Sequence, residues 1–344
     1  MTKTAAGAAS PCYNGMNTLG AVAGAASGTF FLFERFGNHT TLYIACVLNA
    51  GVAGVAWLMS RGETLQESRA AAPRRDTSQE TAAPLPLVLL ASAVTGFVFL
   101  LMDLVWYRML SPIFGGTAFT FGLILAVALL GIGIGGVMYS LAAGERRPTL
   151  NGFACTCALE ALFVTIPFAL GDRLAILAML LQPLGTLGFY GNVLGWFALC
   201  SVIVLPAAII AGIQFPMLLG LLGRGRDEIG TQTGAAYAWN TAGAIVGSLA
   251  GGFGFIPVLT ATGTWKLVAI LLVICAFLAA IVGQRGRGRP LRALPSVLIG
   301  TFVILMWVFA TGPTAAWRHS QLSLLKKYDR TVQRNTRPPA SPPP

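Results

Sequence analysis

Five polar side chains that could do chemistry stand inside or beside long apolar stretches of the sequence. They are Glu160, Asp103, Arg108, Gln214 and Asn240. A charge near the middle of a membrane helix costs roughly 2.5–3.5 kcal/mol, so it is normally paired, protonated or functional. Glu160 lies near the middle of the apolar run 151–170, where it is either a proton or cation site or a hydrogen-bonded structural carboxyl.

Asp103 and Arg108 stand toward the outer end of the apolar run 85–110. A separation of five residues places them about 140° apart around a helix, so they face different neighbours. Arg108 follows Trp106 and Tyr107, a combination typical of an anchor at the membrane interface. Asp103 and Arg108 are also candidate residues for binding a substrate or an ion, and the anchor role is the structural alternative for Arg108.

Gln214 and Asn240 are uncharged and have structural alternatives as well. Gln214 lies between Pro206 and Pro216, which free backbone carbonyls and kink a helix. Such a kink either lines a cavity or serves packing. Asn240 and its earlier equivalent Asn17 precede glycine-rich runs, where an amide bonds a neighbouring helix or a ligand.

The sequence does not assemble a metal site, a catalytic triad or a cofactor site. His39 and His319 stand alone, and the six cysteines lie in or beside apolar runs as small buried hydrophobes. Residues 131–136 match G-x-G-x-x-G, but they lie inside the apolar run 117–143 without an acid about 20 residues further on. We therefore expect helix packing there, and no catalytic residue, metal or cofactor.

The composition excludes an ordinary soluble domain. The chain is 55% apolar and 10% charged, whereas soluble domains carry about 25% charged residues. Runs of about 18 or more uncharged residues are long enough to cross a bilayer. We expect an all-α fold, a polytopic transmembrane helical bundle of about nine spans. They are placed at about 13–33, 40–59, 85–110, 117–143, 151–170, 191–222, 235–258, 264–284 and 293–312. The interrupted piece 174–190 is expected to be re-entrant or interfacial.

The basic residues are distributed unevenly over the expected loops. If the first helix runs outward, most cations lie on one side, in the N-terminus, the linker 60–84 and the loops 144–149, 223–228 and 285–292. The other side keeps Arg35, Arg108, Arg173 and Lys266. This asymmetry predicts a multi-pass protein of the cell (inner or plasma) membrane with a cytoplasmic N-terminus and linker. It explains the net charge of +11 without a nucleic-acid partner. The basic tail is the exception, because a full crossing at 293–312 places it outside.

An internal repeat gives the expected architecture. Asn17, Thr18, Gly20, Ala21, Gly24, Gly28 and Phe30 stand where the later copy has Asn240, Thr241, Gly243, Ala244, Gly247, Gly251 and Phe253. Glycines at every fourth residue let two membrane helices approach closely, so these glycines are predicted to pack helices. Repeated helical units are typical of transporter folds.

Three longer motifs resemble a known family. DLVWYRMLSPIFGGTAFTFGLILAVALLGIGIGG (103–136), PAAIIAGIQFPMLL (206–219) and YAWNTAGAIVGSLAGGF (237–253) are similar to the membrane region of fused spermidine synthase-like proteins. In that family a major-facilitator-like membrane region precedes an aminopropyltransferase domain, so the resemblance implies polyamine biosynthesis. Met102 and Asp103 stand in place of the family's Tyr-Glu pair, and the residues after Thr311 are too few for the catalytic domain, so we do not expect aminopropyl transfer from this sequence.

The repeat, the composition and the charge distribution together predict a division into five parts. They are the last two helices of a truncated first repeat (1–59), a cytoplasmic linker (60–84), a six-helix membrane unit (85–285), an additional helix (286–312) and a basic, Pro-rich disordered tail (313–344). We expect a non-catalytic scaffold, module or fragment in the lipid bilayer that self-associates or pairs with a separate synthase or first-half chain. The alternative is a major-facilitator-like transporter of an amine, with Glu160 recognising a polyamine ammonium.

Overall fold

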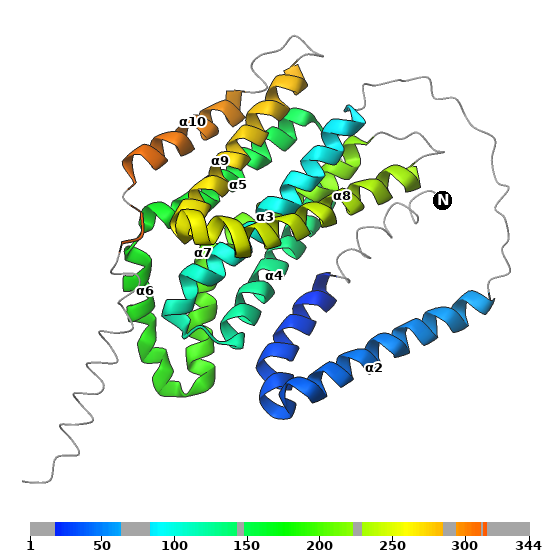
Figure 1. Ribbon diagram of the computed structural model, residues 1–344, viewed down its shortest axis with the longest axis vertical. Helices are drawn as coiled ribbons and strands as arrows, with labels where there is room; N and C mark the ends of the chain where they lie inside the picture. The colour runs from blue at the N-terminus through cyan, green and yellow to red at the C-terminus, as the bar shows by residue number, and fades with distance from the viewer. Residues whose placement is uncertain are drawn as a thin grey trace, which may run out of the picture.

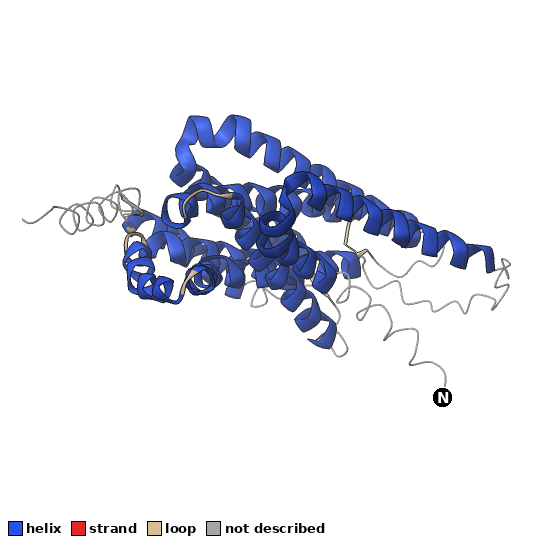
Figure 2. Cartoon of the chain, turned by 90° about the horizontal axis from the view of Figure 1, so that it is seen from below, coloured by secondary structure: helices blue, strands red, loops and turns tan. Residues whose placement is uncertain are grey.

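A computed structural model describes residues 18–62, 83–142, 148–222, 229–284, 294–310 and 312–314. Throughout this part of the chain the regular elements are helices (Figures 1 and 2). After a helix at 18–27 they are η1 (Gly28–Leu32), α2 (Phe33–Gly62), α3 (Leu85–Phe114), α4 (Ala118–Ala142), α5 (Leu150–Leu170), α6 (Arg173–Leu181), η2 (Gln182–Leu187), α7 (Phe189–Leu221), α8 (Ile229–Ala250), η3 (Gly251–Phe255), α9 (Ile256–Gln284) and α10 (Leu294–Phe309). The all-α expectation is confirmed for these residues.

The long apolar helices are those of a multi-pass membrane protein. In the described residues, 6 helical stretches are long and apolar enough to cross a membrane. Two of them, Thr18–Met59 and Gly230–Gln284, are 42 and 55 residues long and each contains a break. α10 has 16 residues, fewer than the roughly 20 that a span requires. The figure of about nine spans therefore stays a prediction.

The first described segment is a helical hairpin that stands to one side of the other helices. Its first arm includes the π-helical turn η1, and its second arm is the greater part of α2, which points away from the bundle (Figure 1). The arms join at Gly37, whose φ of 69° and ψ of 180° are accessible to glycine and costly for other residues. In the most apolar window of this hairpin 0% of residues are buried.

The same backbone features return, at equal spacing, where α8 passes into α9. The π-helical turn η3 stands in the place of η1, and Thr260 in the place of Gly37, with φ 67° and ψ 169°. The hydroxyl of Thr41 donates to the Gly37 carbonyl over 2.7 Å, and the hydroxyl of Thr264 donates to the Thr260 carbonyl over 2.8 Å. The two hairpins therefore turn in the same way.

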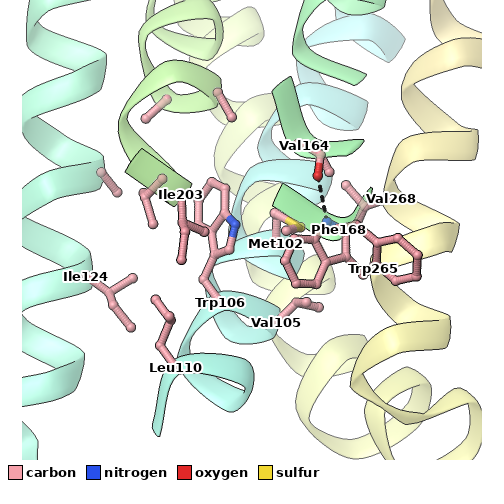
Figure 3. Packing of buried hydrophobic residues seen from close by; sticks show 14 of the residues in the cluster. Met102, Val105, Trp106, Leu110, Ile124, Val164, Phe168, Ile203, Trp265 and Val268 are labelled. Carbon is pink, nitrogen blue, oxygen red and sulfur yellow. Dashed lines mark hydrogen bonds between the residues drawn. The ribbon is translucent and has the colours of Figure 1, made fainter. Parts of the chain in front are cut away.

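Helices α3 to α9 pack around a shared core. α3 lies along α8, α4 along α7, and α5 against α7 and α9, with α10 on the outer side of α5 and α9 (Figure 1). The core includes Trp106 and Trp265, 2% and 1% exposed, from α3 and α9 (Figure 3). The apolar sequence of these helices on all sides is typical of helices surrounded by protein and lipid.

The predicted piece 174–190 forms the short helices α6 and η2. They end at Gly188, whose positive φ of 87° reverses the chain into α7. Both pack against α7. The depth of the segment 174–190 in a membrane is not tested, so its re-entrant or interfacial position stays a prediction.

Most of the linker 60–84, the tail 313–344 and the arginine-rich loops lie outside the described residues. The orientation predicted from their charges, and the division of the chain into five parts, therefore stay predictions.

Candidate site in the helix core

Glu160 and Gln214 meet in the core between α5 and α7. The Gln214 Nε2 donates a hydrogen bond to the Glu160 carboxyl over 2.6 Å. Glu160 is 5% exposed and Gln214 is 1% exposed. Two residues that are far apart in the sequence thus form one polar pair inside an apolar environment, where a hydrogen bond is electrostatically strong.

Local sequence features position these two side chains. α5 is capped by Thr149, the residue before its first turn, whose hydroxyl accepts a hydrogen bond from the Gly152 backbone N–H over 3.1 Å. This cap fixes the start of the helix that carries Glu160. α7 continues through Pro206 and Pro216, which flank Gln214. A proline removes a backbone hydrogen bond within a helix.

Two thiols lie close to this pair in the core. Cys157, one turn before Glu160 on α5, has its Sγ 3.9 Å from the Sγ of Cys275 on α9. Cys157 is buried and Cys275 is partly buried. The described residues do not gather three His, Cys, Asp or Glu side chains that could hold a metal ion. The chemistry available here is that of a buried carboxyl that can keep or exchange a proton.

Asp103 and Arg108 lie on different faces of α3. Asp103 is 4% exposed, and its Oδ1 has no hydrogen-bond partner among the described residues. Arg108 is exposed. The structure therefore does not bring these two side chains together.

Asn240 is bound to α3. Its Nδ2 donates to the backbone carbonyl of Ser92 over 3.0 Å and lies 3.4 Å from the hydroxyl oxygen of Thr95. A Cβ atom on Gly96 would collide with the Asn240 carbonyl. Asn240 thus contributes to the contact between α3 and α8, and its earlier equivalent Asn17 lies outside the described residues.

The later glycine series lies against α3. A Cβ on Gly243 would collide with the Ala93 carbonyl, and a Cβ on Gly247 with the Phe97 carbonyl. At Gly251 a Cβ would come within 2.7 Å of the Leu101 side chain. The backbone contacts at Gly243 and Gly247 require glycine, because any side chain there would push α8 away from α3, whereas the Leu101 side chain near Gly251 can shift.

The earlier glycine series has open space in front of it. No heavy atom of the described residues lies within 4 Å of a Cβ placed on Gly20, Gly24 or Gly28. The same arm contacts α4 through other residues, since Thr29 fills the space at Gly122 and Phe30 stacks on Phe119 with ring centroids 6.0 Å apart.

One partly open cavity lies apart from the predicted residues. It has a volume of about 170 Å³ and is lined by the end of α3, by α6 and η2, and by the first turns of α7, including Gln182, Asn192 and Trp196. None of the five polar candidates lines it.

Several interhelical contacts were missed from the sequence. Trp265 Nε1 donates to the Val164 carbonyl over 2.9 Å (Figure 3), and Trp307 Nε1 donates to the Thr165 hydroxyl over 3.0 Å. Lys266 lies over the rings of Phe168 and Trp307, 5.6 and 5.7 Å from their centroids. A tryptophan in an apolar helix has a donor that needs an acceptor, and this was the available signal.

Comparison with known proteins adds no relative. No protein-family model, curated protein or solved structure matches the chain.

Proposed function

We propose that this protein is a non-catalytic membrane module that works by assembling with another membrane polypeptide through the hairpin 18–59. One observation carries the proposal. The most apolar windows of the other five candidate spans have 39–61% of their residues buried, whereas that of Thr18–Met59 has 0%. Because Thr29 and Thr41 are buried, this window lies in α2, which therefore offers an uncovered helical face to a partner. Membrane helices associate by such packing.

The internal polar groups support a structural role. The Glu160 carboxyl is hydrogen-bonded to Gln214 and the Asn240 amide to α3. Polar groups paired across helices hold a bundle together. In keeping with the resemblance of the motifs, the partner is proposed to be a separately encoded aminopropyltransferase or a first-half membrane chain.

The oligomeric state in membranes tests this proposal. The full chain would be extracted in mild detergent from membranes of its source cell and weighed by native mass spectrometry beside a variant lacking residues 18–59. We expect the full chain in a complex of fixed stoichiometry with a second polypeptide and the variant as a monomer. A monomeric full chain would refute the assembly role.

A second candidate function, transport of an amine, is favoured by Asp103. A carboxyl that is 4% exposed, with an oxygen that lacks a partner among the described residues, is costly in an apolar core. Uptake of labelled spermidine into liposomes holding the purified chain tests it, with Asp103→Asn and Glu160→Gln alongside. Uptake above empty vesicles that both variants lower would support transport, and uptake equal to that of empty vesicles would exclude it for the isolated chain.

A further inference from the structure

The first arms of the two hairpins are equivalent in sequence, but only the later one has its glycine face covered by another helix. This difference indicates what the earlier hairpin binds. In the second hairpin, α8 places Gly243 and Gly247 against the backbone of α3, and Asn240 bonds the same helix. In the first hairpin, Gly20 and Gly24 stand at the equivalent positions with open space in front of them. The equivalent glycine faces therefore differ: α3 packs on the later one, and none of the described helices packs on the earlier one.

The first arm nevertheless contacts α4 at two points. Thr29 contacts α4 at Gly122, and Thr18 reaches Gly133 on the same helix. The η1 turn precedes the break at Gly37 as η3 precedes the break at Thr260. The glycine stripe of the first hairpin, which we define as Gly20, Gly24 and Gly28, is thus presented on a face that α4 leaves uncovered.

The second arm provides an independent observation. Asn49 is exposed on α2, and its equivalent on α9 is Leu272, which is 1% exposed in the core. Leu42 is 61% exposed, and its equivalent Trp265 is 1% exposed. An amide in the middle of an apolar helix is unfavourable toward lipid and bonds across helices where a partner is present. Asn49 therefore marks the face of α2 that corresponds to the covered face of α9.

The geometry points to a docking surface, formed by the glycine stripe and the Asn49 face of α2, for an apolar membrane helix of another polypeptide with the packing pattern of α3. That pattern is a small residue and an exposed backbone carbonyl at every fourth position, as Ser92, Gly96 and the Ala93 carbonyl provide toward α8. The α3 of a second copy is not free for this role, because its own α8 covers it. This inference rests on the proposed assembly function and names its surface and partner.

A helix of known sequence can stand in for the partner. A dye-labelled peptide of residues 85–114, which is α3 itself, would be added to the purified full chain in lipid nanodiscs, and its fluorescence anisotropy followed. We expect saturable binding of one peptide per chain. Gly24→Val should weaken this binding at least tenfold, because the added side chain keeps the helix backbones apart, and Asn49→Leu should weaken it more modestly.

The chain offers a matched control. Gly51 on α2 also has no atom within 4 Å of a Cβ, but its equivalent Ile274 is 48% exposed, on the outer face of α9. Gly51→Val should leave binding unchanged. The inference is overturned by absence of peptide binding, by binding that Gly24→Val does not weaken, or by a peptide-independent dimer of the full chain that Gly24→Val abolishes. If native complexes form in membranes while the peptide does not bind, this surface is wrong and the assembly role stands.

Discussion

Gly37 and Thr260 adopt the same left-handed, extended backbone conformation at equivalent points of the two hairpins. Their φ angles are 69° and 67°, and their ψ angles are 180° and 169°. Glycine reaches this region without strain, whereas a residue with a branched Cβ costs of order 1–3 kcal/mol there. Thr260 is the one non-glycine residue with positive φ in the described part of the chain.

The first prediction exchanges these two residues. Thr260→Gly should stabilise the protein by about 1 kcal/mol, because relief of strain exceeds the entropy that glycine loses on folding. Gly37→Thr should destabilise it by about 1–3 kcal/mol for the reverse reason. Thermal unfolding in detergent, followed by tryptophan fluorescence, measures both. A loss of stability in Thr260→Gly would show that its hydroxyl contacts with Thr262 and Gly263 outweigh the strain.

The second prediction concerns the contact between α3 and α8. Gly243→Val should destabilise the protein by about 1–3 kcal/mol, since the new side chain would enter the space of the Ala93 carbonyl. Gly234→Val on the same helix is the control, because no atom lies within 4 Å of a Cβ there. Guanidinium or SDS unfolding of the two variants measures the difference. Equal stabilities would contradict the close approach of the two helices.

The third prediction tests the buried pair by a double-mutant cycle. Glu160→Leu should cost about 1–3 kcal/mol, because it leaves the Gln214 amide buried without its acceptor. Glu160→Gln keeps an acceptor and should cost less. Adding Gln214→Leu to Glu160→Leu should restore much of the lost stability, since neither polar group remains. Additive losses in unfolding free energy would mean that the two side chains act independently.

The fourth prediction concerns the attachment of α10. Trp307→Phe removes the donor to the Thr165 hydroxyl and should weaken the docking of α10 on α5 by about 1 kcal/mol, roughly a fivefold change in the open population. Amide hydrogen exchange of residues 294–309 in nanodiscs reports this opening. Trp239→Phe on α8, where the side chain is 49% exposed, should leave that exchange unchanged.

The helices could be predicted from the sequence because lipid imposes a simple rule on it. A long uncharged run must satisfy its backbone hydrogen bonds internally, which favours a helix. The predicted run 117–143 corresponds to α4 at Ala118–Ala142, and 151–170 to α5 at Leu150–Leu170. α3 extends beyond its predicted end to Phe114, since Pro112 is accommodated inside the helix.

The pairing of side chains could not be predicted in the same way. Glu160 and Gln214 meet because α5 and α7 turn particular faces toward each other. When a helix is apolar on every side, its sequence does not indicate which face it turns toward a neighbouring helix. The equivalence of the hairpins extends further than the sequence indicated. Identities become sparse after Phe30 and Phe253, yet Thr41 and Thr264 make the same hydrogen bond beyond the break. Backbone conformation here is retained where side chains have changed.

The π-helical turns have a consequence for the phase of each first arm. A π turn accommodates one residue more than an α turn, and one residue corresponds to about 100° of rotation around a helix. The side chains after Phe255 therefore point in directions that an uninterrupted α-helix from Asn240 would not give them. Deleting a single residue between Gly251 and Phe255 would therefore return the turn to α geometry and leave the Thr260 corner on its present side of the bundle, whereas an α turn that kept every residue would rotate that corner by about 100°.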